Sequence, residues 1–177
     1  LAELEDRPTP ADLIWTRRDA AIVHLMLGAG LRVGEVAALK VTDVEVRDRS
    51  GQVTVRLGKG NKHRTVPLNA DVRAEVAAWL AIRPETDAEA LFVSRRGKGL
   101  GRRALQRVVE KLGNEAEVEE ATPHVLRHSF AKNLVDAGVG LEKVADLLGH
   151  SRLETTRIYT RPSQRDLERA VESVALR

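Results

Sequence analysis

The chain has 177 residues, of which 42% are hydrophobic and 31% are charged. This length and composition fit one globular domain or two small lobes with a real core, and they exclude a disordered chain. The sequence has no cysteine, which excludes disulfides, thiolate metal sites and cysteine nucleophiles. Its net charge of +3 is only mildly basic, so the placement of the basic residues matters more than their number.

The sequence carries no membrane or secretion signal. No apolar run approaches the roughly 20 residues that cross a bilayer, and the first ten residues lack a basic-then-apolar pattern. We therefore expect a cytoplasmic protein without a membrane partner. The low aromatic content, 3%, argues against recognition of single strands by base stacking.

The first part of the chain predicts helices followed by a hairpin. Thr16 and Asp19 have the spacing of a capping box and predict a helix that starts there and ends at residues 28–30. A short helix is predicted in residues 32–40. Two β-rich runs in residues 52–68, separated by a tip with two glycines and a lysine, predict a β-hairpin.

Helices dominate the rest of the chain, so the predicted fold class is mostly α with a small antiparallel β-sheet. The acidic residues 115–120 are interpreted as a solvated connector. Thr122 and Pro123 predict the start of one helix, as N-cap and first helical residue. Apolar spacing predicts helices over residues 70–83, 101–113, 124–138, 141–149 and 164–176.

The glycine-rich stretches do not predict a nucleotide cofactor. Residues 28–34, GAGLRVG, miss the dinucleotide-binding spacing by one residue and follow a predicted helix rather than a strand. Residues 58–64, GKGNKHR, lack the P-loop pattern.

Two groups of polar residues are candidates for phosphate chemistry. His124 and Arg127 are three residues apart in the first turn of a predicted helix, where both can address one anion. The alternatives are a solvated helix start, or zinc held by His124 and His128, although Arg127 would repel a cation. Arg32 with Glu35 one turn later fits either a functional pair or an ordinary surface ion pair.

Lys59 lies at the tip of the predicted hairpin. Glycine and lysine are ordinary turn residues, so its position has a simple structural explanation. In the functional interpretation, Lys59 is a flexible ammonium above a groove that donates a proton to a leaving oxygen.

Four segments together resemble the tyrosine recombinase, or phage integrase, family, and especially its Xer-type members. They are residues 30–44, 58–68, 124–131 and 147–160, and the resemblance extends from about residue 19 onward. Gly34 departs from the family, in which a serine is more usual; we interpret this as a change in helix propensity only. Matched by motif, the family's catalytic set falls on Arg32, Lys59, His124, Arg127, His150 and Tyr159, with Glu35 at its accessory acidic position.

The resemblance implies cleavage of duplex DNA through a 3′-phosphotyrosyl intermediate, with Tyr159 as the nucleophile and Lys59 as the acid for the 5′ hydroxyl. Arg32, Arg127 and His150 would stabilise the phosphate charge, and His124 would assist proton transfer. Neither a metal, ATP nor another cofactor is implied. A two-metal nuclease would need converging carboxylates. Asp43 and Glu45 form the only close strand-spaced pair, which we interpret as a solvated sheet face.

A basic cluster follows the middle of the chain and suits contacts with DNA phosphates. A plain solubilising surface is the alternative. The predicted DNA contacts in this cluster are Arg95, Arg96, Lys98, Arg102 and Arg103, with Arg107 beside them. The predicted hairpin adds Lys62 and Arg64, with His63 beside them.

The sequence predicts a C-terminal catalytic domain of a site-specific recombinase, without the family's N-terminal DNA-clamping domain. A type IB topoisomerase-like enzyme and a non-catalytic DNA-binding regulator are the alternatives. An apolar stripe in residues 164–176 either packs on its own domain or, as the resemblance implies, reaches a neighbouring protomer in a homotetramer on DNA. We expect the isolated domain to be monomeric.

Overall fold

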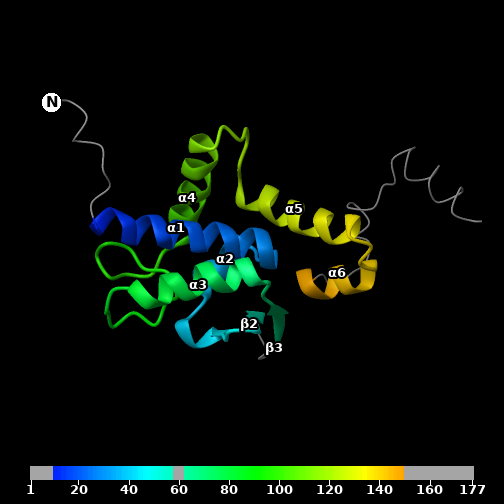
Figure 1. Ribbon diagram of the computed structural model, residues 1–177, viewed down its shortest axis with the longest axis horizontal. Coiled ribbons are helices and arrows are strands. Elements are labelled where there is room, and N and C mark those ends of the chain that lie inside the picture. Colours follow the sequence, from blue (N-terminus) through cyan, green and yellow to red (C-terminus); the bar gives the residue numbers. More distant parts are fainter. Residues whose placement is uncertain (1–9, 58–61, 150–177) are drawn as a thin grey trace, which may run out of the picture. The chain divides into compact units, whose positions relative to one another are not determined.

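The computed structural model describes residues 10–57 and 62–149 (Figure 1). The chain divides into two compact units, Leu1–Phe130 and Ala131–Arg177. The described residues are mostly helical and include a three-stranded antiparallel sheet, which confirms the predicted fold class. The elements are α1 (Pro10–Ala29), α2 (Val33–Ala38), a 3₁₀ turn (Val41–Asp43), β1 (Val44–Val46), β2 (Gly51–Leu57), β3 (Lys62–Pro67), α3 (Ala70–Ile82), α4 (Arg102–Glu115), α5 (Pro123–Asp136) and α6 (Leu141–Leu148).

The core of the first unit lies between α1, α3 and the sheet. Helices α1 and α3 run side by side (Figure 1) and bury Ile22, Met26 and Trp79 completely. The Trp79 indole nitrogen donates to the carbonyl of Leu91, at 2.9 Å, so this large ring is buried without an unpaired donor. Helix α2 packs against α1, and β1 packs against α3.

The sheet has the strand order β1-β2-β3, and the β2–β3 pair confirms the predicted hairpin. Side chains alternate between the two faces, as strand geometry requires. Val53 and Val66 are paired across the strands and buried, and Val55 is buried opposite Arg64. An arginine therefore occupies a register position on the same face as the core valines.

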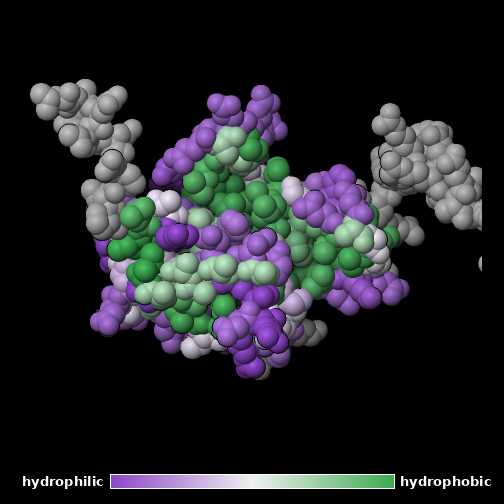
Figure 2. Space-filling model, viewed as in Figure 1, coloured by the Kyte–Doolittle hydropathy of each residue, from purple (hydrophilic) through white to green (hydrophobic). Residues whose placement is uncertain are grey.

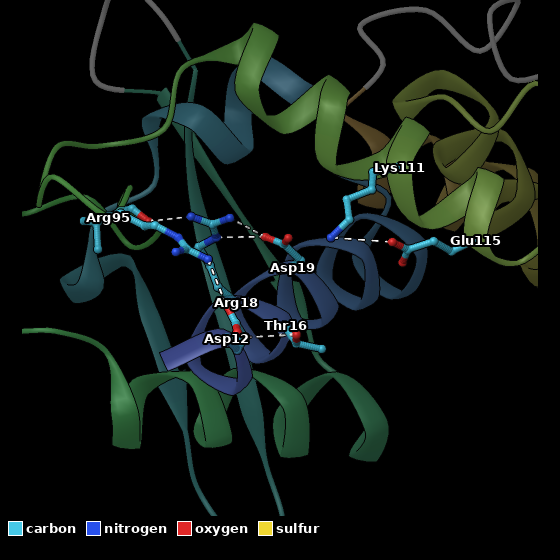
Figure 3. A network of polar contacts seen from close by, with 8 residues as sticks. Asp12, Thr16, Arg18, Asp19, Arg95, Lys111 and Glu115 are labelled. Carbon is cyan, nitrogen blue, oxygen red and sulfur yellow. Dashed lines mark hydrogen bonds and ion pairs between the residues drawn. The ribbon is translucent and has the colours of Figure 1, made fainter. Parts of the chain in front are cut away.

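A polar network attaches the segment before α4 to α1 (Figure 3). The Arg18 guanidinium donates to the carbonyl of Val93, at 3.1 Å, and lies 5.0 Å from the ring centre of Trp15. Arg95 also lies over this ring and donates to Asp12, at 3.1 Å. These contacts position the chain immediately before α4 begins.

The predicted start of the first helix is wrong. Helix α1 begins at Pro10, and the Thr16 hydroxyl donates to the carbonyl of Asp12, at 3.0 Å, within the helix. A threonine that bonds four residues back in a helix has no capping role. Asp19 is buried and pairs with the neighbouring Arg18. The predicted end is correct, because Gly30 follows α1 with a left-handed φ of +62°.

The remaining described helices agree with the predictions, and residues 116–120 are exposed as expected of a solvated connector. On the face shown in Figure 2, hydrophobic residues lie between hydrophilic ones. Within the described residues, no helix has both the length and the apolar character to cross a membrane. The predicted helix in residues 164–176 lies outside the described residues.

Candidate functional site

Arg32 lies in the sharp turn between α1 and α2. The left-handed Gly30 reverses the chain, Leu31 is buried, and Arg32 is the N-cap of α2. Its backbone amide donates to Glu35 Oε2, at 2.8 Å, and its Nη1 donates to Glu35 Oε1, at 3.0 Å. The predicted Arg32–Glu35 pair is therefore present, and Arg32 is held from both its backbone and its side chain.

Glu35 is also bound by an arginine from the hairpin. Arg64 Nη1 and Nη2 donate to the two carboxylate oxygens at 2.8 and 2.9 Å, and only 9% of the Arg64 side chain is exposed. Burial works to raise the pKa of Glu35, but the hydrogen bond from Arg64, the Arg32 amide and both arginine charges hold this pKa below its ordinary value. Glu35 is thus a largely buried, ionised link between α2 and β3 rather than part of an ordinary surface ion pair.

An open pocket of about 420 Å³ lies at the start of α2. Its lining combines small and apolar residues of α2 with three arginines and one carboxylate. Such a surface favours an anion. The lining residues are Arg32, Val33, Gly34, Glu35, Ala38, Arg56 and Arg102.

Arg56 enters this pocket from β2 and is held by a buried acid. Its Nε and Nη2 donate to Asp43 Oδ1 at 3.0 and 2.5 Å, while the Lys40 amide donates to Oδ2 at 2.9 Å. The hydrogen bond to Asp43 and its charge raise the pKa of Arg56 above its ordinary value. The expectation that Asp43 lies on a solvated sheet face is wrong, because its side chain is only 2% exposed and its charge is paired inside.

Arg102, from the first turn of α4, lies directly against Gly34. A Cβ built on Gly34 would stand 2.9 Å from Arg102 Nε and 3.0 Å from Nη2, too close for the present arrangement. Gly34 therefore affects more than the helix propensity that its departure from the family suggested. The missing side chain leaves room for a guanidinium.

His124 and Arg127 lie at the start of α5. The Val125 amide donates to the Thr122 hydroxyl, at 3.2 Å, which confirms the predicted cap. Arg127 is 5% exposed, and its Nη1 donates to the carbonyl of Gly30, at 2.5 Å. This bond ties α5 to the turn that carries Arg32. His124 is exposed.

The other predicted DNA contacts have different surroundings. Arg64 is engaged by Glu35, and Arg95 is paired with Asp12 on the Trp15 ring. The side chain of Lys62, where β3 begins, lies outside the described residues. Four further residues of this set are exposed, namely Arg96, Lys98, Arg102 and Arg103.

Lys59, His150 and Tyr159 of the predicted catalytic set lie outside the described residues. Within the residues that are described, no group of three or more histidine, aspartate or glutamate side chains could hold a metal ion. The site described here is thus the arginine-lined part, to which α2, β2, β3 and α4 contribute.

Sequence reasoning missed Arg56 and its partner Asp43. One signal was available: on a strand in which Val53 and Val55 face the core, Arg56 must face outward. The burial of Asp43 has no comparable local signal, because it depends on Arg56, 13 residues away, and on the fold of the 3₁₀ turn.

The model of the phage integrase family matches residues 13–165. The chain belongs to this family. It is 38% identical over 152 residues to tyrosine recombinase XerC of Corynebacterium glutamicum, covering 85% of this chain and 48% of that protein. It is 40% identical over 162 residues to tyrosine recombinase XerA of Pyrococcus furiosus, covering 90% of this chain and 55% of that protein.

A solved structure has the same fold as this phage integrase-family chain. It is the XerH site-specific recombinase bound to its difH substrate, in a pre-cleavage complex. The TM-score is 0.76 at 30% identity, and the match covers 90% of this chain and 47% of that one. The chain spans about half the length of the curated relatives it matches.

Proposed function

We propose that this chain is the catalytic domain of a site-specific DNA recombinase that cuts and rejoins duplex DNA. The observation that carries the proposal is the preorganised Arg32, exposed at an arginine-lined pocket and fixed by Glu35 and Arg64. Fixed cations stabilise charge that develops on phosphate oxygens without the cost of reorientation. The names of the similar proteins, tyrosine recombinases and a site-specific recombinase, favour recombination over topoisomerase-like resealing or regulation.

In the proposed cleavage step, the Tyr159 oxygen bonds to the phosphorus and the bond from phosphorus to the 5′ oxygen breaks. A free phenol has a pKa near 10, so the proton of Tyr159 must leave as the new bond forms, with help from His124. Lys59 donates a proton to the departing 5′ oxygen. Arg32, Arg127 and His150 stabilise the charge on the other phosphate oxygens.

In the proposed rejoining step, the 5′ hydroxyl of another strand attacks the phosphotyrosyl link. The attacking hydroxyl gives its proton to Lys59, the bond from phosphorus to the Tyr159 oxygen breaks, and the phenol recovers its proton. One ester bond replaces another in each step, so the covalent intermediate conserves the energy of the phosphodiester. The scheme therefore uses neither ATP nor a metal.

The proposed partner is double-stranded DNA, and the proposed assembly is a homotetramer formed on DNA. Exchange of strands between two duplexes requires an active site for every strand that is cut, which gives four protomers. In this proposal residues 164–176 pack on a neighbouring protomer, while the isolated domain remains a monomer.

A nicked suicide duplex tests the proposed chemistry. The full-length protein should form a covalent adduct on a denaturing gel, and Tyr159→Phe should form none because only the nucleophilic oxygen is removed. Tyr159 is the only tyrosine in this chain, so no other phenol in it can substitute. Duplex binding by the variant, measured by mobility shift, should remain close to that of the wild type.

The same assay in EDTA separates the proposal from metal-dependent cleavage. The adduct should form with EDTA and without nucleotide. An adduct formed by Tyr159→Phe, or activity that EDTA abolishes and magnesium restores, would contradict the proposed function.

A further inference from the structure

We propose that Arg56 and Arg102 form a second phosphate subsite, which binds a DNA phosphate adjacent to the one that is cleaved. This inference rests on the proposed function, because it assumes that the pocket at α2 receives a DNA strand. It adds Arg56, which the sequence did not indicate, and gives Arg102 a defined position in the pocket.

The Arg56 guanidinium is held on one side by Asp43 and keeps its remaining N–H donors on its exposed side. Asp43 lies beneath it with both carboxylate oxygens engaged, one by Arg56 and one by the Lys40 amide. The guanidinium has five N–H donors, and Asp43 takes two of them. The Arg56 side chain is 65% exposed, so the other donors face a ligand or solvent.

Arg102 supplies the second cation without a carboxylate of its own. Within the described part of the chain no acid pairs with it, although it lines the same pocket as Arg56. Its guanidinium lies against Gly34, at the place that a side chain at position 34 would occupy. Gly34 therefore positions Arg102 at the pocket.

The charges in the pocket exceed what one phosphate needs. Arg32, Arg56 and Arg102 bring three positive charges, against one negative charge on Glu35. Arg64 and Asp43, which hold two of these residues from behind, carry opposite charges that cancel in the sum. A phosphodiester carries one negative charge, and the proposed mechanism already gives the cleaved phosphate Arg127 and His150 as well. The surplus fits a second phosphate of the same strand.

The first test measures binding of the full-length protein to its duplex as salt is raised. The double variant R56A/R102A should bind more weakly, by roughly tenfold for each arginine. The slope of log K against log salt should become shallower by about 0.9 for the lost phosphate contact. Lys111→Ala is the matched control, because it removes one exposed charge from the same helix about 14 Å from Arg102. Its slope should not change.

Neutral methylphosphonates then locate the contact. Each phosphate within two positions of the cleaved one is replaced in turn, which removes its charge. One replacement should weaken binding by the wild type and leave binding by R56A/R102A unchanged. If every replacement weakens both proteins equally, or if the salt slope of the variant matches that of the wild type, the subsite is wrong.

Gly34→Ala should weaken DNA binding without lowering thermal stability. Alanine favours helix more than glycine does, so the melting temperature should stay level or rise. The added Cβ should push Arg102 away and weaken DNA binding about as much as Arg102→Ala does. In the Arg102→Ala background, Gly34→Ala should have no further effect on binding; an equal loss there would overturn the role of Gly34.

These outcomes are distinguishable from failure of the proposed function. Adduct formation by the wild type on the suicide duplex tests the proposed function, and the salt slopes test the second subsite. If the wild type forms no adduct, the proposed function fails whatever the salt slopes show. If the wild type forms it and the slopes do not differ, only the second subsite fails.

Discussion

At the scale of single residues, Arg64 is a positioning residue that acts on Arg32 through Glu35. Arg64→Gln removes the two bonds to the Glu35 carboxylate and leaves a half-paired buried charge. We expect a loss of about 1–3 kcal/mol in the free energy of unfolding. Single-turnover cleavage should also slow, by up to about a hundredfold, because a small misplacement of Arg32 is costly.

A comparison of two variants separates positioning from stability. Glu35→Gln in the Arg64→Gln background removes the half-paired charge, so denaturation should show recovered stability. Cleavage should remain slow, because Arg32 has then lost its carboxylate partner. Recovery of the cleavage rate together with stability would mean that Arg64 is only structural.

The acid stability of the protein should also depend on Glu35. Its pKa in the fold is lowered from 4.5, so its contribution to stability is fully present above the ordinary pKa and is lost as pH falls through the lower folded pKa. Between pH 7 and pH 3, the free energy of unfolding of Glu35→Gln should therefore fall less than that of the wild type. Denaturant titrations across this pH range measure the difference, and parallel curves would contradict it.

At the scale of elements, the turn between α1 and α2 depends on Gly30. A Cβ there would lie 2.2 Å from the Phe130 ring, and the left-handed φ is itself unfavourable for alanine. We expect Gly30→Ala to lower stability by more than about 2 kcal/mol, as strain of about 1 kcal/mol and overpacking combine. DNA cleavage should fall as well, since the carbonyl of Gly30 holds Arg127.

Gly138→Ala is the matched control for this prediction. Gly138 also has a positive φ, of +78°, but a Cβ there meets nothing within 4 Å. Thermal melting should therefore show only the backbone cost, about 1 kcal/mol. Equal losses in the two variants would mean that the contact with Phe130 does not matter.

At the scale of the whole molecule, assembly is the property to test. Deletion of residues 164–177 from the full-length protein should impair recombination between two sites more than binding to one site, because the proposed role of this segment is contact between protomers. Native gels with one duplex or two, together with a recombination assay, measure the two steps. Recombination at the wild-type rate would contradict the docking role.

The sequence by itself determined most of the secondary structure and the family. Apolar spacing located the described helices after α1, and the glycine-containing tip located the hairpin, because both patterns reflect neighbours along the chain. The placement of Arg32 at a helix start and the pairing with Glu35 are likewise local, three residues apart. These features needed no knowledge of distant contacts.

Only the tertiary structure decided which charged residues are buried and which are presented. Arg64 was predicted as a DNA contact, yet it is held by Glu35, which is 29 residues away in the sequence. The sequence predicted Asp43 as a solvated acid, but in the fold it is buried and paired with Arg56. The role of Gly34 depends on its contact with Arg102, which lies on α4. A charge enters a protein interior only when a partner meets it there, and the fold alone brings such partners together.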